Sequence, residues 1–204
     1  MTGSRHSPDA VVNALTFDVE DWFHGFGLPP STWPSYPPRL SVGLLRILDL
    51  LDAHQVQATF FILGALVTEW RSLLGLIADA GHEIAAHGYG HTPVYRLSPA
   101  AFADDLRQVL AALRSISDQP VRSYRAPFFS ITKQSLWALP ILADAGIAYD
   151  SSIVPAPNPR YGIPGAHRFP HLVSTRPRPL MECPISTLAI GKVNLPFSGG
   201  FYAR

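Results

Sequence analysis

Two histidines and three acidic residues have a spacing that suits metal chemistry. His87 and His91 lie four residues apart in HGYGH, which on one turn of the chain would point both imidazoles at a single metal ion. Asp18, Glu20 and Asp21 fall within four residues directly after an apolar run. Carboxylates that crowd together repel each other unless a cation or an arginine shares their charge. The pattern predicts a metal site of two histidines and one carboxylate.

A metal held by only three protein ligands keeps coordination positions for water and substrate, so it can act as a Lewis acid. Arg125 is a further candidate, because a charge at the end of an apolar segment is costly unless a carboxylate pairs with it. Its planar guanidinium suits Asp18. Each motif also has a plainer interpretation: the histidines could be a loop cap and a solvated side chain, and the acids a solvated loop with a helix cap.

The elements that must position these residues follow from the hydrophobic pattern. Predicted strands are residues 10–17, 58–63, 83–86, 121–125 and 147–149. Predicted helices are residues 39–54, 66–80, 98–113 and 131–145, the last with a kink at Pro140. Residues 25–38 hold five prolines and two glycines, which predicts a loop without regular structure. From residue 151 onward we expect loops and short strands, among them residues 180–184 and 187–193.

Alternation of strands and helices with short connections is typical of a parallel sheet or barrel in an α/β fold. The candidate residues share one position in this pattern, since the acids, His87, Arg125 and Asp150 each stand at the carboxyl end of a different predicted strand. The carboxyl ends of parallel strands meet at one edge, where such folds build their active sites. We therefore predict that these side chains meet in space.

The composition is that of a globular enzyme-sized domain. The chain has 204 residues, 47% of them hydrophobic, and a formal net charge of +1, which argues against disorder and against nucleic-acid binding. Its single cysteine, Cys183, cannot form an intrachain disulfide and is expected to pack as a small hydrophobe. We expect a disordered segment at residues 1–9 and one catalytic domain at residues 10–204. Neither a signal peptide nor a transmembrane segment is predicted, so a cytoplasmic location is expected.

Four motifs resemble those of a known family. They are TFDVEDWFH from residue 16, HGYGH from residue 87, YRAPFF from residue 124 and YDSS from residue 149. In order and spacing they are similar to the successive motifs of polysaccharide deacetylases, the NodB-homology group or carbohydrate esterase family 4. The resemblance runs from about residue 13 to residue 200. With ECPIST and NLPFSGG further on, the sequence looks like the branch found beside exopolysaccharide and exosortase loci in bacteria.

The resemblance implies a distorted (β/α) barrel of about seven strands, a divalent metal (zinc first, cobalt or nickel as alternatives) and hydrolysis of N-acetyl groups. The implied substrate is an N-acetylated oligo- or polysaccharide, here a bacterial exopolysaccharide or its precursor. Asp18 matches the family's general base, His87 and His91 its metal ligands, and Arg125 the arginine that holds the base. The residues expected to contact substrate are Trp22, Tyr124, Pro127, Phe128 and Asp150.

The sequence departs from the family pattern at two places. Val19 stands where the family usually has a second aspartate, so Glu20 or Asp21 must supply the carboxylate ligand. Glu20 shares the face of Asp18 if the strand continues, whereas Asp21 is better placed if the chain turns. The family's closing Leu-x-His motif, which carries the general acid, has no counterpart after residue 194. We therefore expect the domain to lack its last strands, and the exposed sheet edge would favour poor solubility or dimerisation.

Two other functions compete with the deacetylase. One is a metal-independent amidase of the same fold acting on a cyclic amide, but intact His87 and His91 argue against it. The other is a catalytically inactive fragment that binds saccharides, which the early end of the chain favours and the four intact motifs weaken. Measuring bound metal would separate the metal-independent amidase from the saccharide-binding fragment, and a deacetylation assay would separate that fragment from the active deacetylase.

Overall fold

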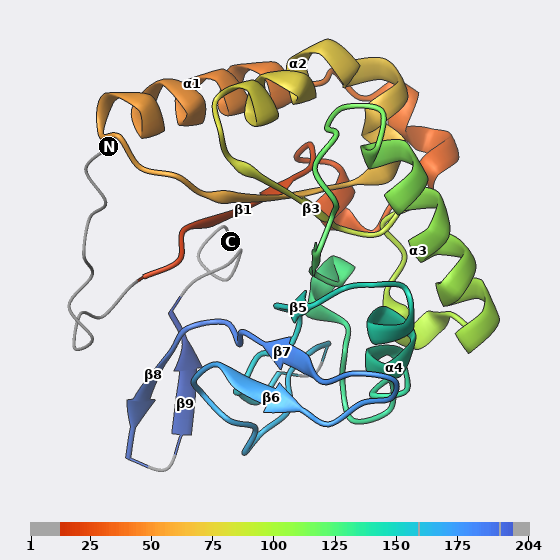
Figure 1. Cartoon of the computed structure of the whole chain (residues 1–204), viewed down its shortest axis with the longest axis vertical. Coiled ribbons are helices and arrows are strands. Elements are labelled where there is room, and N and C mark those ends of the chain that lie inside the picture. The colour runs from red at the N-terminus through yellow and green to blue at the C-terminus, as the bar shows by residue number, and fades with distance from the viewer. Residues whose placement is uncertain (1–12, 159, 192, 198–204) are drawn as a thin grey trace.

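The computed structural model describes residues 13–158, 160–191 and 193–197. A sheet with helices packed against it occupies the centre of the molecule, and a separate two-stranded hairpin lies near its C-terminal end (Figure 1). The segment predicted to be disordered, residues 1–9, lies outside the described residues, as do residues 10–12 of the first predicted strand.

The predicted alternation of strands and helices is confirmed. The strands are β1 (Thr16–Val19), β2 (Thr59–Ile62), β3 (Glu83–Ala86), β4 (Ser123–Tyr124), β5 (Tyr149–Asp150), β6 (His171–Val173), β7 (Leu180–Glu182), β8 (Thr187–Ile190) and β9 (Val193–Pro196). The α-helices are α1 (Leu40–Ala53), α2 (Val67–Asp79), α3 (Pro99–Leu113) and α4 (Ala138–Asp144). Short 3-10 helices are η1 (His24–Phe26), η2 (Pro30–Ser35), η3 (Gly64–Leu66), η4 (Val94–Arg96) and η5 (Pro127–Phe129).

Within the described residues, the main sheet has seven strands in the order β1-β2-β3-β4-β5-β7-β6. The first five strands follow the chain and pair in parallel, β5 pairs in parallel with β7, and only β6 runs antiparallel to its neighbour. This confirms the predicted parallel α/β sheet. Strands β1 and β6 form its two edges, and no pairing joins them within the described residues, so closure into a barrel stays a prediction.

The helices form where the sequence carries an apolar stripe and a starting signal. In α1 the buried face consists of Leu40, Leu44 and Leu51, at helical spacing. Helix α3 begins with a capping serine, whose hydroxyl accepts a hydrogen bond from the Ala101 N–H at 3.2 Å, followed by proline at the first helical position. No helix in the described ranges is both long and apolar enough to cross a lipid bilayer.

Two proline-rich segments differ from the prediction. Helix α4 begins at Ala138 rather than at residue 131, so Pro140 lies in its first turn, where its missing N–H costs no helical hydrogen bond and causes no kink. Residues 25–38 are not free of regular structure, because Pro30 starts the 3-10 helix η2. Proline fixes the backbone angle that such a helical start needs, so it acts there as an initiator.

The largest apolar cluster fills the space between the sheet and its helices. Phe60 and Ile62 on β2, fully buried, contribute from the sheet side, and Phe102 and Leu106 contribute from α3. The ring of Phe102 is sandwiched edge-on between Tyr124 and Trp137, at 5.9 and 5.8 Å between ring centroids. This contact ties α3 to the strand that precedes Arg125.

Because Phe102 is fully buried, its replacement by alanine is expected to destabilise the fold by about 3–5 kcal/mol, through lost burial and the cavity left behind. Chemical denaturation of the two proteins measures this difference. Phe169, which is 73% exposed, provides the control, since Phe169→Ala is expected to change stability by no more than about 0.5 kcal/mol. Equal losses in the two variants would contradict the assignment of Phe102 to the core.

Candidate metal centre and active site

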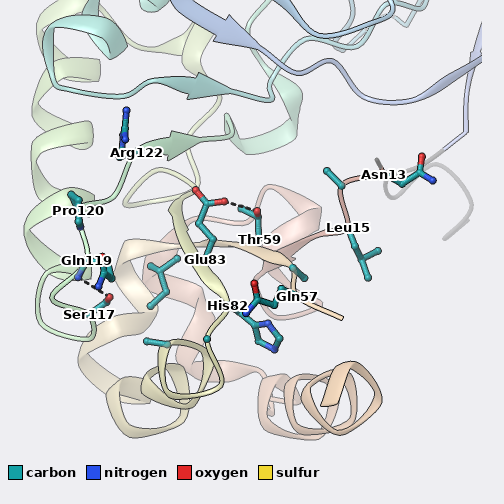
Figure 2. Close-up of a pocket in the computed structure, with 15 residues that line it drawn as sticks. Asn13, Leu15, Gln57, Thr59, His82, Glu83, Ser117, Gln119, Pro120 and Arg122 are labelled. Carbon is teal, nitrogen blue, oxygen red and sulfur yellow. Dashed lines mark hydrogen bonds between the residues drawn. The ribbon is translucent and has the colours of Figure 1, made fainter. Parts of the chain in front are cut away.

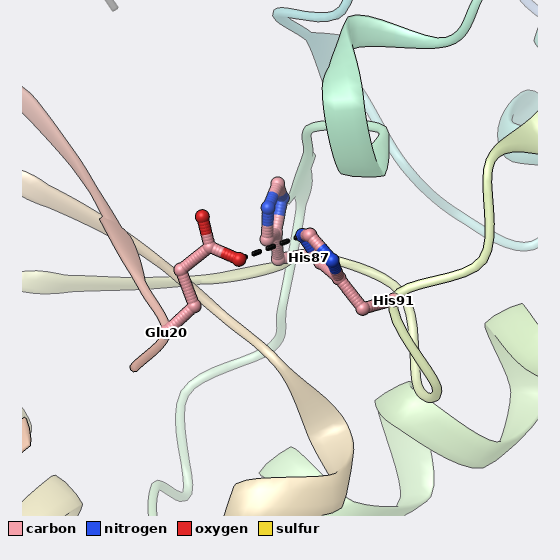
Figure 3. Close-up of side chains that lie close together, drawn as sticks. All are labelled: Glu20, His87 and His91. Atoms are coloured by element: carbon pink, nitrogen blue, oxygen red, sulfur yellow. Dashed lines mark ion pairs between the residues drawn. The ribbon is translucent and has the colours of Figure 1, made fainter. Parts of the chain in front are cut away.

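Glu20, His87 and His91 come together at the carboxyl edge of the sheet. One ligand atom from each lies within 4.8 Å of the others (Figure 3). Glu20 directly follows β1, and His87 directly follows β3, two strands that flank β2. The parallel register therefore brings together residues far apart in the sequence, as the pattern of strand ends predicts.

The extension of β1 explains which acid joins the histidines. The sequence placed the end of this strand at residue 17, with Asp18 after it. In the structure the strand continues to Val19, so Asp18 lies inside it. Side chains alternate along a strand, and Val19 is buried in the core, so Glu20 follows on the side of Asp18.

Asp21, the other candidate ligand, has a different position. Its Oδ2 accepts hydrogen bonds from the backbone N–H groups of Arg39 and Leu40, at 2.7 and 3.0 Å, and Oδ1 accepts one from Trp22 N–H at 2.9 Å. These donors include the start of α1, whose first N–H groups have no helical partner. Asp21 thus caps α1 from a distance and is not part of the histidine cluster.

HGYGH forms a tight turn that presents both histidines to one point. Gly88 has a positive φ of 72°, and a Cβ there would lie 3.0 Å from Pro127 Cγ, so the turn requires glycine on both counts. Asp105 on α3 holds the turn by accepting hydrogen bonds from the N–H groups of Tyr89 and Gly90, at 3.0 and 3.3 Å. Sequence reasoning missed Asp105, because nothing along the chain links it to the histidines.

His87 is held in the state that a metal ligand requires. His87 Nδ1 lies 2.9 Å from the carbonyl oxygen of Arg125, which accepts its proton and leaves Nε2 as the ligand atom. Burial lowers the pKa of His87, so its imidazole is neutral at neutral pH. His91 Nε2 and Glu20 Oε2 are 2.7 Å apart, and neither has a further hydrogen-bond partner among the described residues. Two imidazoles and a carboxylate with spare lone pairs fit a divalent metal such as zinc.

Arg125 pairs with Asp18, as predicted. Its Nη1 donates to Asp18 Oδ1 at 2.7 Å, and Nη2 donates to Thr16 Oγ1 at 3.0 Å and Ser151 Oγ at 2.9 Å. The guanidinium also stacks 4.1 Å from the ring centre of Phe61. Burial raises the pKa of Asp18, but the charge and hydrogen bond of Arg125 act against this, and the pKa lies below its usual value. Asp18 is therefore ionised at neutral pH.

The residues expected to contact substrate fall into two groups. Trp22, 45% exposed, lines the same pocket as Asp18 and Glu20. Phe128 is half-buried, and its ring lies 4.4 Å from that of His91. Pro127 is buried against the Gly88 turn. Tyr124 and Asp150 are 1% and 0% exposed, which corrects the expectation that they touch substrate. Both side chains point into the interior from β4 and β5.

His24 is a buried polar residue that sequence reasoning passed over. It is 1% exposed, and its Nδ1 accepts the Asp21 N–H at 2.8 Å, so the ring proton sits on Nε2, which has no partner among the described residues. Burial lowers its pKa to about 4, so the ring is neutral. Its centroid is 6.2 Å from that of His91. Only its place at the end of DVEDWFH hinted at a role.

Two pockets lie at opposite ends of the strands of the sheet. One of about 420 Å³ borders the carboxyl end of β1 and the start of α1, and Asp18, Glu20 and Trp22 are among its lining residues. The other, of about 780 Å³, lies at the amino ends of the strands (Figure 2). There Thr59 Oγ1 donates to Glu83 Oε2 at 2.6 Å. The second pocket is thus separate from the metal cluster.

The sequence is similar to those of known deacetylases. The chain is 31% identical over 135 residues to a chitooligosaccharide deacetylase from Bradyrhizobium, covering 65% of this chain and 59% of the relative. It is 28% identical to a peptidoglycan deacetylase from Helicobacter pylori, covering 55% and 38%. The chain therefore spans about half the length of the curated relatives that it matches.

Solved structures show the same fold. A protein from Mycobacterium smegmatis assigned as a polysaccharide deacetylase superposes with a TM-score of 0.70 and 25% identity, covering 92% of this chain and 64% of that one. A pseudoenzyme of carbohydrate esterase family 4 from Bacillus anthracis superposes with a TM-score of 0.54 and 26% identity, covering 71% and 44%.

Two family models match the sequence. Residues 151–204 match a domain of unknown function, DUF3473, and β7 and β6 from this segment complete the sheet that β1 to β5 begin. Residues 7–149, which contain every residue of the Glu20, His87 and His91 cluster, match the polysaccharide deacetylase model. The chain belongs to the polysaccharide deacetylase family.

Proposed function

We propose that the protein is a metal-dependent hydrolase that removes N-acetyl groups from an N-acetylated saccharide. The observation that carries this proposal is the convergence of Glu20, His87 and His91 beside the Asp18–Arg125 ion pair. A metal site next to an oriented carboxylate provides the parts that amide hydrolysis needs. The names of the relatives, deacetylases of chitooligosaccharide and of peptidoglycan, support a saccharide substrate.

Glu20, His87 and His91 would hold the metal, for which we propose zinc, with cobalt or nickel as alternatives. Two imidazole nitrogens and one carboxylate oxygen are a ligand set that zinc enzymes use with an open coordination position. Such a cation, when bound, supplies Lewis-acid polarisation of the acetamide carbonyl and a lowered pKa of water. The Arg125 carbonyl, by accepting the His87 Nδ1 proton, keeps that ligand in one orientation.

Asp18 is the proposed general base. It is ionised at neutral pH, its side chain retains 24% exposure, and Oδ1 is fixed by Arg125 at 2.7 Å. The carboxylate would take a proton from the attacking water, and Arg125 would keep the group oriented and charged before that transfer. Arg125 does not itself exchange a proton, since a guanidinium stays charged in proteins.

The turn after β4 offers a donor for the charge that develops on the acetamide oxygen. The N–H of Arg125 is bonded to the Ala86 carbonyl at 2.9 Å, and that of Ala126 to Ser152 Oγ at 2.8 Å. Pro127 has no N–H, so Phe128 supplies the next backbone donor, in a residue with a positive φ of 56°. Trp22 and the Phe128 ring are proposed to stack on sugar faces.

For the substrate we propose a bacterial exopolysaccharide or its precursor. The basis is the likeness of DVEDWF, ECPIST and NLPFSGG to the branch found beside exopolysaccharide loci. The alternative is a saccharide-binding protein without turnover, and its basis is the likeness in fold to a family pseudoenzyme. Metal binding and turnover must therefore be measured separately.

Metal content provides the first test. Purified wild-type protein is expected to hold about one divalent ion per chain, and His87→Ala and His91→Ala are each expected to lose it, because two remaining ligands hold zinc weakly. Elemental mass spectrometry measures the ratio, and circular dichroism checks that the variants fold. Folded wild-type protein that binds no zinc, cobalt or nickel would sink the proposal.

The two neighbouring acids provide a matched pair. Glu20→Ala is expected to lose the metal while remaining folded, because its carboxylate belongs to the cluster. Asp21→Ala is expected to keep the metal and to lose about 1–2 kcal/mol of stability, since the N–H groups of Arg39 and Leu40 lose their acceptor. Metal analysis and denaturation of both variants are the measurements. The reverse pattern would make Asp21 the ligand.

Replacing the base separates turnover from binding. Asp18→Asn is expected to lower kcat for release of acetate from an N-acetylglucosamine oligomer by about 10²–10⁴-fold, since an amide cannot accept the proton, while the metal content stays at the wild-type ratio. Asp49→Asn, an exposed change on α1, is the control for a lost negative charge. Wild-type protein that carries metal but never releases acetate would favour the binding protein.

A further inference from the structure

Two carboxyl groups lie side by side in the interior next to Arg125. Asp150 on β5 and Glu182 on β7 are register partners in the parallel ladder, and both residues are 0% exposed. Asp150 Oδ1 accepts a hydrogen bond from Ser152 Oγ at 2.6 Å, and Glu182 Oε1 accepts one from Ile153 N–H at 3.1 Å. The remaining oxygens, Asp150 Oδ2 and Glu182 Oε2, are buried and find no donor elsewhere in the described chain.

Two ionised carboxylates cannot be neighbours in a site that water does not reach. Their repulsion and the loss of hydration would each cost several kcal/mol, of the order known for buried uncompensated charges. One proton between the two unsatisfied oxygens removes both problems, because O–H···O⁻ is a short and strong hydrogen bond. The other two oxygens, Asp150 Oδ1 and Glu182 Oε1, already accept hydrogen bonds from the Ser152 hydroxyl and the Ile153 N–H.

We propose that Asp150 and Glu182 share one proton, and that the resulting hydrogen bond is a positioning device that holds Arg125 against Asp18. The part played in catalysis rests on the proposed function, in which Asp18 is the base. Neither acid touches the substrate, since both are fully buried. Their effect passes through the two serines that follow Asp150.

Ser151 and Ser152 connect the acid pair to the guanidinium. Ser151 accepts from Arg125 twice, through its carbonyl oxygen at 3.1 Å from Nε and through its hydroxyl at 2.9 Å from Nη2. Ser152 Oγ donates to Asp150 and accepts the N–H of Ala126, the residue after Arg125. Asp150 therefore fixes a segment that bonds Arg125 on both its side chain and its adjoining backbone.

The surroundings decide which acid carries the proton. Burial raises the pKa of Asp150, while the hydrogen bond with Glu182, the hydrogen bonds of Ser152 and, least of all, the Arg125 charge favour its charged form. Burial and the Asp150 charge raise the pKa of Glu182 well above its usual value, so Glu182 is the protonated partner.

The other ionisable groups around the pair are Tyr124 on β4, Cys183 after β7 and His171, which is paired with Glu182 across the β6–β7 ladder. Burial raises the pKa values of the Tyr124 hydroxyl and the Cys183 thiol, so both stay uncharged at neutral pH. Among the neighbouring charged groups, Arg125 is a cation whose charge favours the ionised form of Asp150.

The proton has a defined effect on stability. A buried acid whose pKa is raised by folding contributes stability that is fully present below its unfolded pKa and is lost as the pH rises toward the folded one. Glu182→Gln replaces the shared proton with an amide N–H that donates at every pH, with Oε1 still able to accept from Ile153. The equilibrium constant for folding of the wild-type protein, divided by that of this variant, is expected to fall about tenfold per pH unit above about pH 4.3.

Denaturation of wild type, Glu182→Gln and the exposed control Glu69→Gln across a pH series measures this loss, together with the infrared C=O band of a protonated carboxyl group. We expect the band to weaken in Glu182→Gln and the stability curves of wild type and Glu69→Gln to run parallel. A Glu182→Gln curve parallel to wild type, with an unchanged infrared band, would overturn the shared proton. Neither readout depends on activity, so a failure of the proposed function is recognised separately.

Kinetics test the positioning role. Glu182→Ala is expected to lower kcat about 10- to 100-fold with little change in KM and full metal content, because Arg125 loses its support, and Glu182→Gln is expected to recover most of this loss. Recovery by glutamine distinguishes a hydrogen-bonding role from simple packing. Equal kcat values in Glu182→Ala and Glu182→Gln would overturn the positioning role. If Glu182→Ala does not fold, a Glu182→Gln protein with the infrared band and the pH curve of the wild type would overturn it instead.

Discussion

The buried guanidinium of Arg125 is the interaction on which the site depends. A permanent positive charge that is 4% exposed must be neutralised and hydrogen-bonded, or the fold cannot accommodate it. Asp18 and Thr16 on β1 and Ser151 after β5 supply its acceptors, and Phe61 on β2 supplies an aromatic face. Satisfying this one group therefore links the first, second and fifth strands at the edge where the ligands also lie.

The same residue links the proposed base, Asp18, to the proposed metal ligands. The side chain of Arg125 orients Asp18, while its carbonyl oxygen accepts the proton of His87 Nδ1. The charge of Arg125 also keeps Asp18 ionised despite burial. A shift of the strand end that carries Arg125 would thus disturb both the proposed base and a proposed ligand. The segment around it is held by β3, by Ser152 and, through Ser152, by the buried acid pair.

Neighbouring acids in DVEDWF have different tasks because the chain changes direction among them. Asp18 and Glu20 share one side of an extended strand and face Arg125 and His91. Asp21 follows where the strand has ended, and its carboxylate caps the start of α1, eighteen residues further on. Electrostatic attraction to N–H groups at a helix start is what holds this acid away from the cluster.

The sequence by itself determined the parallel α/β pattern and the strand ends that carry the candidate residues, because period and turn signals are local properties. It also showed that the charge of Arg125 at a strand end needs a carboxylate partner, for which Asp18 was the candidate. Only the tertiary structure placed Glu20 rather than Asp21 beside the histidines, and only it showed that Tyr124 and Asp150 are buried. It also revealed the positions of Glu182, Asp105 and His24 near the site. These outcomes depend on strand register and on donors far along the chain, such as Arg39 N–H for Asp21 and Ser152 Oγ for Asp150. Long-range hydrogen bonding leaves no periodic trace in a single sequence, so packing alone assigns such partners.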